Sequence, residues 1–255
     1  MPTLLKSQHD VRSVRRTLVD QLLPVTALHA ELEQGCELAL DVPGARARLK
    51  AGQSAFDPFV VFTGAKDLPR AVQRMTSALE HAGLCGSDAL ARVRGVEPDV
   101  VRLGRAWIGG EPLPSDEARR LARRAVALVG NAVLRRASRE VCGATTLRIS
   151  DRAACPCCGG PAEFSVSGGQ VRRLVCSRCD TVWRTTRRGC LGCGAEGDPA
   201  VARIPSASLG YDLTICHHCG RYLKERTVRS APALLVERIM TAELDAAAQE
   251  RGLRM

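Results

Sequence analysis

Apolar residues recur at three- and four-residue steps through much of the first 150 residues, which is the spacing of one helix face. Residues 18–36 follow this pattern, and Pro24 should kink or split the helix. Asp67 followed by Pro69 predicts the start of another helix, which ends near Gly83. The strongest pattern starts with Ser115 as the cap, two acidic residues follow it, and Gly143 closes the helix.

This last helix is predicted to be amphipathic. Its apolar face consists of Leu121, Ala125, Leu128, Val129 and Ala132. Its basic residues lie mostly elsewhere on the helix: Arg119, Arg120, Arg123, Arg124, Arg135 and Arg139. We expect these arginines to form a solvated face, and a docking surface for an acidic partner is the alternative.

The pattern changes between residues 151 and 230, where glycine, cysteine and short apolar alternations replace helical spacing. Residues 164–175 alternate around Gly168-Gly169, which predicts a hairpin. A second hairpin should place Val201 and Ile204 opposite Leu213 and Ile215. Residues 231–251 return to helical spacing, and Gly252 should end that helix.

Eight of the twelve cysteines form four Cys-x-x-Cys pairs: Cys155/Cys158, Cys176/Cys179, Cys190/Cys193 and Cys216/Cys219. The pairs repeat as Cys-x-x-Cys, hairpin, Cys-x-x-Cys, twice in succession, which indicates an internal duplication. Two intervening residues let one turn present both sulfurs to a single ion, and the hairpin brings the second pair opposite the first. Eight thiolates therefore predict two complete four-cysteine metal sites, with no open coordination position.

Two features of these sites stay open. Pairing along the chain groups the first two pairs in one site and the last two in the other, whereas interleaved sites would need longer crossings. Tetrahedral sulfur suits zinc or a single iron equally well.

The remaining cysteines and two histidines are not assigned as ligands. Cys157 is a spare thiol within the first pair, either an incidental small residue or a thiol open to oxidation or metal exchange. Cys36, Cys85 and Cys142 lie in helical sequence and should be small buried residues. His217 and His218 should be exposed turn residues, because four cysteines already complete their site.

Composition and charge narrow the class of protein. The first residues contain no apolar signal core and no segment could span a bilayer, so we expect a cytoplasmic protein without membrane contact. In that reducing compartment, paired cysteines indicate metal or redox chemistry. The formal net charge is +10, but eight thiolates and two divalent ions would lower it by four. Residues 151–230 carry 12 basic and 7 acidic side chains and become nearly neutral once loaded, which argues against nucleic acid as a partner.

No nucleophile–base pair, phosphate-binding loop or dinucleotide fingerprint is present, so the sequence predicts a protein that is not an enzyme. The motifs instead resemble those of the FdhE family of formate dehydrogenase accessory proteins. The resemblance rests on CPxCGxP at 155–161, CSxCxTxW at 176–183, the step from Arg187 to Cys190-x-x-Cys193, and Cys216-x-x-Cys219 before Tyr222-Leu223-Lys224. It extends into TAELDAAAQERG at 241–252.

The resemblance implies an α+β protein. A mainly α-helical N-terminal domain (1–150) precedes two tandem rubredoxin-like four-cysteine modules (151–185 and 186–230) and a C-terminal helix (231–255). It also implies that the eight paired cysteines bind two metal ions, iron or zinc. The implied function is accessory or chaperone-like: the protein binds the immature catalytic subunit of formate dehydrogenase in the cytoplasm.

Six residues near the metal turns are candidates for contact with that subunit: Trp183, Arg184, Arg187, Arg188, Tyr222 and Lys224. Tryptophan and arginine often anchor interfaces. The alternatives for them are packing for Trp183 and solubility for the arginines. Two other functions remain open, a zinc-ribbon nucleic-acid binder and a rubredoxin-like electron-transfer or redox protein.

Overall fold

The fold is α+β, as predicted, with helices first and the sheet after them. A computed structural model describes residues 17–84, 99–143, 147–149, 152–168, 171–206, 209–227 and 233–255. The helices are α2 (Leu23–Gly35), α3 (Val42–Lys50), α4 (Pro58–Thr63), α5 (Leu68–His81), α7 (Val100–Gly109), α8 (Glu117–Cys142), α9 (Leu234–Met240) and α10 (Ala242–Glu250). The strands are β1 (Leu147–Ile149), β2 (Ala162–Gly168), β3 (Val171–Cys176), β4 (Val182–Thr185), β5 (Val201–Ser206), β6 (Tyr211–Cys216) and β7 (Tyr222–Arg226).

The helix boundaries largely follow the local signals. Residues 17–21 are helical, Leu22 is a turn and α2 begins at Leu23, so the run is split as predicted, with Pro24 in the first turn of α2. The cap of α8 is Asp116 and not the expected Ser115, because an Asp116 carboxylate oxygen accepts the backbone N–H of Arg119 at 2.8 Å. Gly143 ends α8 with φ of 70°, a left-handed conformation that glycine adopts without strain.

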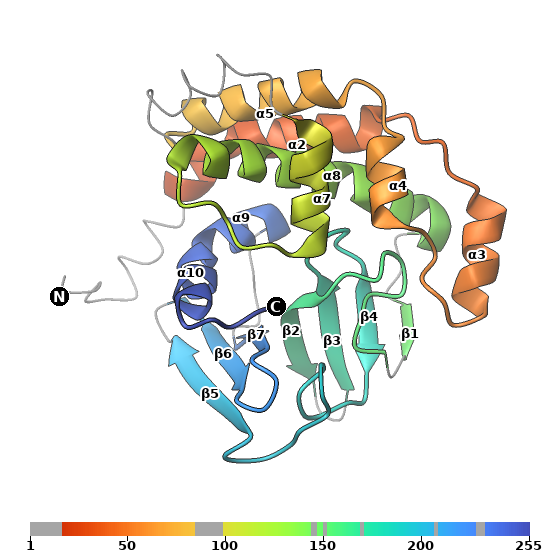
Figure 1. The fold of residues 1–255 in the computed structure, drawn as a ribbon. Helices are drawn as coiled ribbons and strands as arrows, with labels where there is room; N and C mark the ends of the chain where they lie inside the picture. The colour runs from red at the N-terminus through yellow and green to blue at the C-terminus, as the bar shows by residue number, and fades with distance from the viewer. Residues whose placement is uncertain are drawn as a thin grey trace.

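Helix α8 is the centre of the helical layer, which Figure 1 shows above the sheet. It packs against α2, α3, α4, α5 and α7. Four residues of its predicted apolar face are buried, while Leu128 is partly buried.

The basic residues of α8 are not one solvated face. Arg123 is buried and donates to the carbonyl of Glu111 at 3.1 Å. Arg135 and Arg139 pair with buried Glu33 of α2 at 3.1 and 2.6 Å. Two of these cations therefore hold α2 against α8, because an acid from a distant segment reaches them.

Both predicted hairpins are present. Strands β2 and β3 pair antiparallel with Phe164 opposite Val175, and β5 and β6 pair with Ile204 opposite Leu213. Among the described residues the seven strands form one sheet in the order β1-β4-β3-β2-β7-β6-β5. The parallel pairing of β2 with β7 therefore joins the two cysteine modules into a single sheet.

The C-terminal helix is two helices, not one. Thr241 separates α9 from α10, and its hydroxyl bonds back to the carbonyl of Glu237 at 2.9 Å. Leu244 and Ala248 of α10 pack on apolar residues of β6 and β7, and Leu234 of α9 packs beside Phe164. Figure 1 shows both helices against this side of the sheet.

The main hydrophobic core crosses from the helical layer into the first cysteine module. It includes Val129 and Val133 of α8 together with Cys155, Cys176 and Trp183. The divisions near residues 150, 185 and 230 remain predictions, although β1 is a strand within the segment expected to be helical. Within the described part of the chain, no helix combines the length and apolarity needed to cross a membrane.

Candidate metal centres

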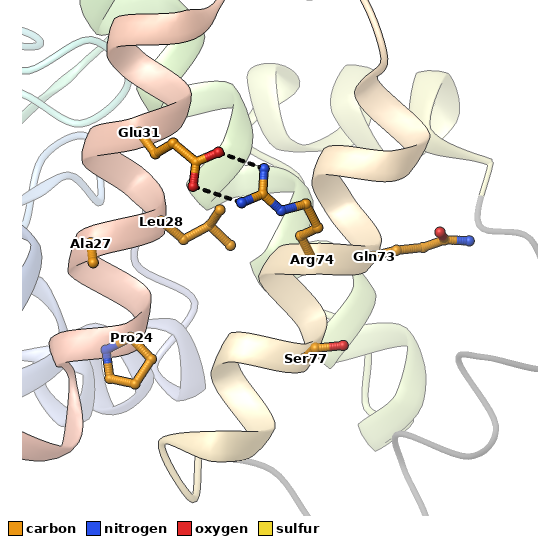
Figure 2. Close-up of a pocket in the computed structure, with 7 residues that line it drawn as sticks. All are labelled: Pro24, Ala27, Leu28, Glu31, Gln73, Arg74 and Ser77. Carbon is orange, nitrogen blue, oxygen red and sulfur yellow. Dashed lines mark hydrogen bonds and ion pairs between the residues drawn. The ribbon is translucent and has the colours of Figure 1, made fainter.

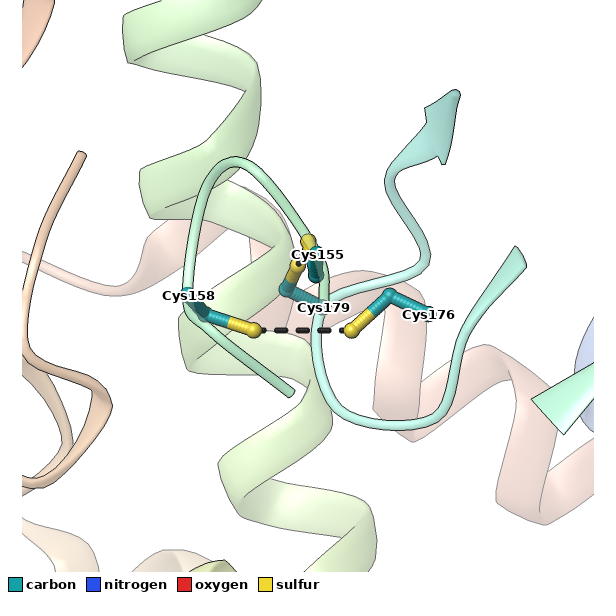
Figure 3. A group of neighbouring side chains, drawn as sticks. All are labelled: Cys155, Cys158, Cys176 and Cys179. Atoms are coloured by element: carbon teal, nitrogen blue, oxygen red, sulfur yellow. Dashed lines mark hydrogen bonds between the residues drawn. The ribbon is translucent and has the colours of Figure 1, made fainter. Parts of the chain in front are cut away.

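The eight paired cysteines gather into two groups of four, and each group follows chain order. Within each group every sulfur lies within 4.8 Å of the others. In the first group the close sulfur pairs are Cys155–Cys179 at 3.6 Å and Cys158–Cys176 at 3.4 Å (Figure 3). In the second group they are Cys190–Cys219 at 3.5 Å and Cys193–Cys216 at 3.6 Å.

These sulfur–sulfur separations suit a metal ion with tetrahedral coordination. A metal–sulfur bond of about 2.3 Å gives sulfur–sulfur edges of about 3.8 Å in a regular tetrahedron. The sulfurs are thus already placed for one ion per group, and interleaved pairing of the four turns is excluded. Four thiolates in this arrangement suit zinc or iron.

One backbone pattern builds all four cysteine turns. In each turn the N–H of the first cysteine donates to the carbonyl five residues later. The four bonds are Cys155 to Gly160 (2.8 Å), Cys176 to Thr181 (3.0 Å), Cys190 to Ala195 (2.8 Å) and Cys216 to Arg221 (2.8 Å). Closing this turn requires a left-handed residue just after the second cysteine of each pair. These residues are Gly159 (φ 70°), Asp180 (φ 56°), Gly194 (φ 77°) and Gly220 (φ 66°).

Asp180 is the functional residue that sequence analysis did not single out. Aspartate tolerates the left-handed region better than most residues, so it can occupy the place that glycine has in the other turns. Its side chain also accepts from Asn131 at 2.9 Å and pairs with Arg135 at 3.2 Å, both on α8. Arg238 of α9 reaches the same carboxylate at 2.8 Å. Asp180 thus connects the first metal group to α8 and α9. The sequence signal that could have identified it is the absence of glycine after the second cysteine pair, where the other three pairs have one.

The two groups differ in burial. All four cysteines of the first group are buried and belong to the main core. In the second group Cys193 is exposed and Cys219 is partly exposed. Backbone N–H groups donate to sulfur at 3.3 Å in both groups, from Arg178 to Cys176 and from Gly192 to Cys190. The first group is therefore part of the folded core, whereas solvent reaches the second.

Three of the six predicted partner contacts are interior residues. Trp183 has no exposed surface, and its indole N–H donates to the carbonyl of Arg152 at 3.4 Å. Tyr222 is buried and donates to a carboxylate oxygen of Asp245 at 2.9 Å. Burial and that carboxylate raise the pKa of Tyr222. A buried side chain cannot contact a partner of the folded protein, so this prediction was wrong for Trp183 and Tyr222.

Lys224 is the third buried residue of that set. Its side chain has no exposed surface, and its ammonium group donates to Glu163 at 3.1 Å, Asp245 at 2.7 Å and Thr241 at 3.1 Å. These groups come from β2 and α10 and from the break between α9 and α10. Lys224 therefore joins the sheet to the C-terminal helices, and the prediction of a partner contact was wrong for it as well.

The other three predicted contacts, Arg184, Arg187 and Arg188, are exposed. Arg187 and Arg188 line a cavity of about 540 Å³ between the sheet and the segment that leads to the second metal group. Arg172 lies in the same cavity and donates to the carbonyl of Arg188 at 3.1 Å. His217 and His218 are exposed, as predicted.

A second cavity, of about 530 Å³, lies between α2 and α5. Figure 2 shows Arg74 reaching across it to Glu31, and the two bonds measure 2.8 and 2.6 Å. This ion pair lowers the pKa of Glu31. The pair satisfies both charges, so the charged groups of this groove already have partners within the chain.

Two comparisons with known proteins each found a protein named FdhE. No family model matches the chain. A protein named Protein FdhE homolog from Aquifex aeolicus (strain VF5) is 31% identical over 106 residues, which span 38% of this chain and 38% of that protein. The crystal structure of the FdhE protein from Pseudomonas aeruginosa superposes with a TM-score of 0.56 and 20% sequence identity, over 99% of this chain and 95% of the other. The chain has the FdhE fold.

Both similarities carry the name FdhE, which supports the resemblance drawn from the cysteine motifs. The sequence match covers little more than a third of either protein. The structural match extends the likeness to nearly the whole chain, helical layer included, and at this level of identity it establishes the fold.

Proposed function

We propose that this chain is an FdhE-type accessory protein that is needed to form active formate dehydrogenase. In this proposal it acts in the cytoplasm, is not itself an enzyme, and binds the immature catalytic subunit. The observation that carries the proposal is the joint occurrence of the FdhE fold and two tandem four-cysteine groups in the order the family motifs imply.

The metal groups support a structural and not a catalytic use of the ions. Each group has four sulfurs for one ion, so a bound zinc or iron would have no free position for a substrate. The first group lies in the core shared with α8, and its ion would hold the cysteine turns against the helices. A metal-loaded protein would present a preformed surface to its client.

Arg184, Arg187 and Arg188 are the proposed contacts with that client. They are exposed, and Arg187 and Arg188 lie beside the cavity next to the second metal group. Arginine forms bidentate bonds with carboxylates and contributes strongly to many interfaces. The proposed surface therefore fits an acidic patch on the catalytic subunit.

The test is co-purification of tagged, metal-loaded protein with a formate dehydrogenase catalytic subunit from the native cytoplasm. We expect the R187E/R188E double variant to lose the subunit while keeping its metal content and its circular dichroism spectrum. The R70E/R119E double variant, an equal reversal of two charges at exposed positions of α5 and α8, is the matched control and should retain it. Equal recovery with both variants would remove the arginine surface from the proposal, and absence of the subunit with the unaltered protein would overturn the accessory function.

Electron transfer is a second candidate, favoured by the exposure of Cys193 in the second group. An iron bound by four thiolates near solvent could exchange one electron with a partner. A reversible change in visible absorption on reduction would support this function. A colourless zinc protein with full activity in enzyme maturation would exclude it.

A further inference from the structure

Two cysteines outside the eight-ligand set lie against each other. Cys142 is the last residue of α8, and Cys157 lies between the ligands Cys155 and Cys158. Their sulfur atoms are 2.7 Å apart. The close sulfur pairs within the metal groups are 3.4–3.6 Å apart, so this contact is far shorter than those set by a shared ion.

The backbone on both sides of the pair is anchored. The carbonyls of Pro156 and Cys157 accept the N–H groups of Ala55 and Phe56 at 3.0 and 3.1 Å, which fixes the first cysteine turn. Arg46 donates to the carbonyl of Val141 at 3.0 Å and so holds the end of α8. These bonds fix the backbone on both sides of the contact, so the two sulfurs can separate only by rotation of a cysteine side chain.

The two thiols differ in access. Cys142 is partly exposed, whereas Cys157 is completely buried. A small oxidant from solvent therefore reaches Cys142 first, and Cys157 is positioned to react only with what forms on Cys142. This is the arrangement of an attacked thiol with a resolving thiol beside it.

We propose that Cys142 and Cys157 form an oxidation site that a hydroperoxide converts to a disulfide while the eight ligands keep their metals. In the first step Cys142 takes one oxygen from the peroxide, which gives a sulfenic acid and releases an alcohol, or water from hydrogen peroxide. In the second step the Cys157 sulfur attacks the Cys142 sulfur, the disulfide forms, and water leaves. The two thiols lose two electrons in total, and the peroxide gains them.

The proposed disulfide between Cys142 and Cys157 would join two parts of the fold. It links the end of α8 covalently to the turn that carries Cys155 and Cys158, at the point where the helical core meets the first metal group. The Thr181 hydroxyl, 3.1 Å from the sulfur of Cys179, bonds Ser138 of α8 in the same junction. Oxidation would thus form a covalent link beside the metal group while the eight ligand cysteines stay unmodified. This inference is independent of the proposed accessory function.

The experiment treats metal-loaded full-length protein with stoichiometric hydrogen peroxide and measures intact mass, metal content and cross-linked peptides. We expect the loss of two hydrogens, a peptide linking Cys142 to Cys157, and unchanged metal content. Cys157→Ser should trap the sulfenic acid on Cys142, which dimedone labels. Cys142→Ser should leave Cys157 unlabelled and unoxidised, because that thiol is buried.

Cys36→Ser is the matched control, since Cys36 is the other described cysteine outside the metal groups and is also partly exposed. The variant should form the disulfide as the unaltered protein does. A disulfide that includes any of the eight ligands, release of metal before the mass changes, or further oxidation of Cys142 without a cross-link would overturn the proposal. Metal content and circular dichroism before oxidation show whether each variant is folded.

Discussion

Replacement of Lys224 by methionine tests whether the buried charges between the sheet and the C-terminal helices hold the fold together. Methionine keeps most of the length and apolar volume of lysine but removes the ammonium group. That group donates to Glu163, Asp245 and Thr241 from a side chain with no exposed surface. The substitution therefore leaves two carboxylates without the cation between them.

The expected loss follows from what those carboxylates retain. Removal of one partner from a buried ion pair typically costs about 3–5 kcal/mol, because the remaining charge is buried and uncompensated. Here Glu163 keeps the guanidinium of Arg238 at 2.6 Å, and Asp245 keeps the hydroxyl of Tyr222 at 2.9 Å. Both remaining contacts limit the cost, so we expect a loss of about 3 kcal/mol, at the lower end of that range.

Urea unfolding of metal-loaded protein, followed by the fluorescence of its two tryptophans, of which Trp183 is buried, measures this loss as a shift of the midpoint at constant slope. Lys66→Met is the matched control, because Lys66 pairs with Glu37 but both side chains are about three-quarters exposed (75% and 73%). Its midpoint should not move measurably. Adding Asp245→Asn to Lys224→Met should recover part of the loss. A Lys224→Met midpoint equal to that of the control would refute the reasoning.

Three further predictions concern the metal, a buried histidine and a helix contact. Cys158→Ser should cost one metal ion per chain by elemental analysis, whereas the adjacent Cys157→Ser should keep full occupancy; equal loss in both would mean that the ligand assignment is wrong. Burial lowers the pKa of His29 below its usual 6.5, so near that pH the unfolded state binds more protons. Stability from this group is present above about pH 6.5 and falls below it, by at most about 1.4 kcal/mol per pH unit, and His29→Gln should flatten that part of the curve. A Cβ on Gly130 would lie 2.3 Å from the Trp107 ring, so Gly130→Ala should lower the unfolding free energy by about 1–3 kcal/mol; a gain would show that the ring moves freely.

Local chemistry in the sequence was sufficient for several elements. The spacing of the cysteine pairs identified the eight cysteines that gather, while the structure decided that they group in chain order. Glycine after three of the pairs marked the left-handed closing residue of each turn, and Gly168-Gly169 marked the first hairpin. The acids after Ser115 placed the start of α8 within two residues of its observed position. Each of these signals depends on residues close together in the chain.

The junction between the modules depends on contacts that no local pattern encodes. The parallel pairing of β2 with β7 joins residues 164–166 to 224–226, and nothing in either strand specifies its neighbour. Lys224 looks like a surface lysine in the sequence, because the carboxylates that make its burial tolerable lie 61 and 21 residues away. The sequence likewise does not show that Asp180 is an interior ion-pair partner, because the groups that bind it lie on α8 and α9.

The sequence by itself thus predicted the cysteines that gather into two groups, the turns that carry them, and the character of the main helices and of both hairpins. Only the tertiary structure decided which charged residues are interior, which strands become neighbours, and that Cys142 meets Cys157. The physical reason is that backbone turns and ligand spacing are set within a few residues. The burial of a charge or a thiol is set by whichever distant groups the fold brings to it.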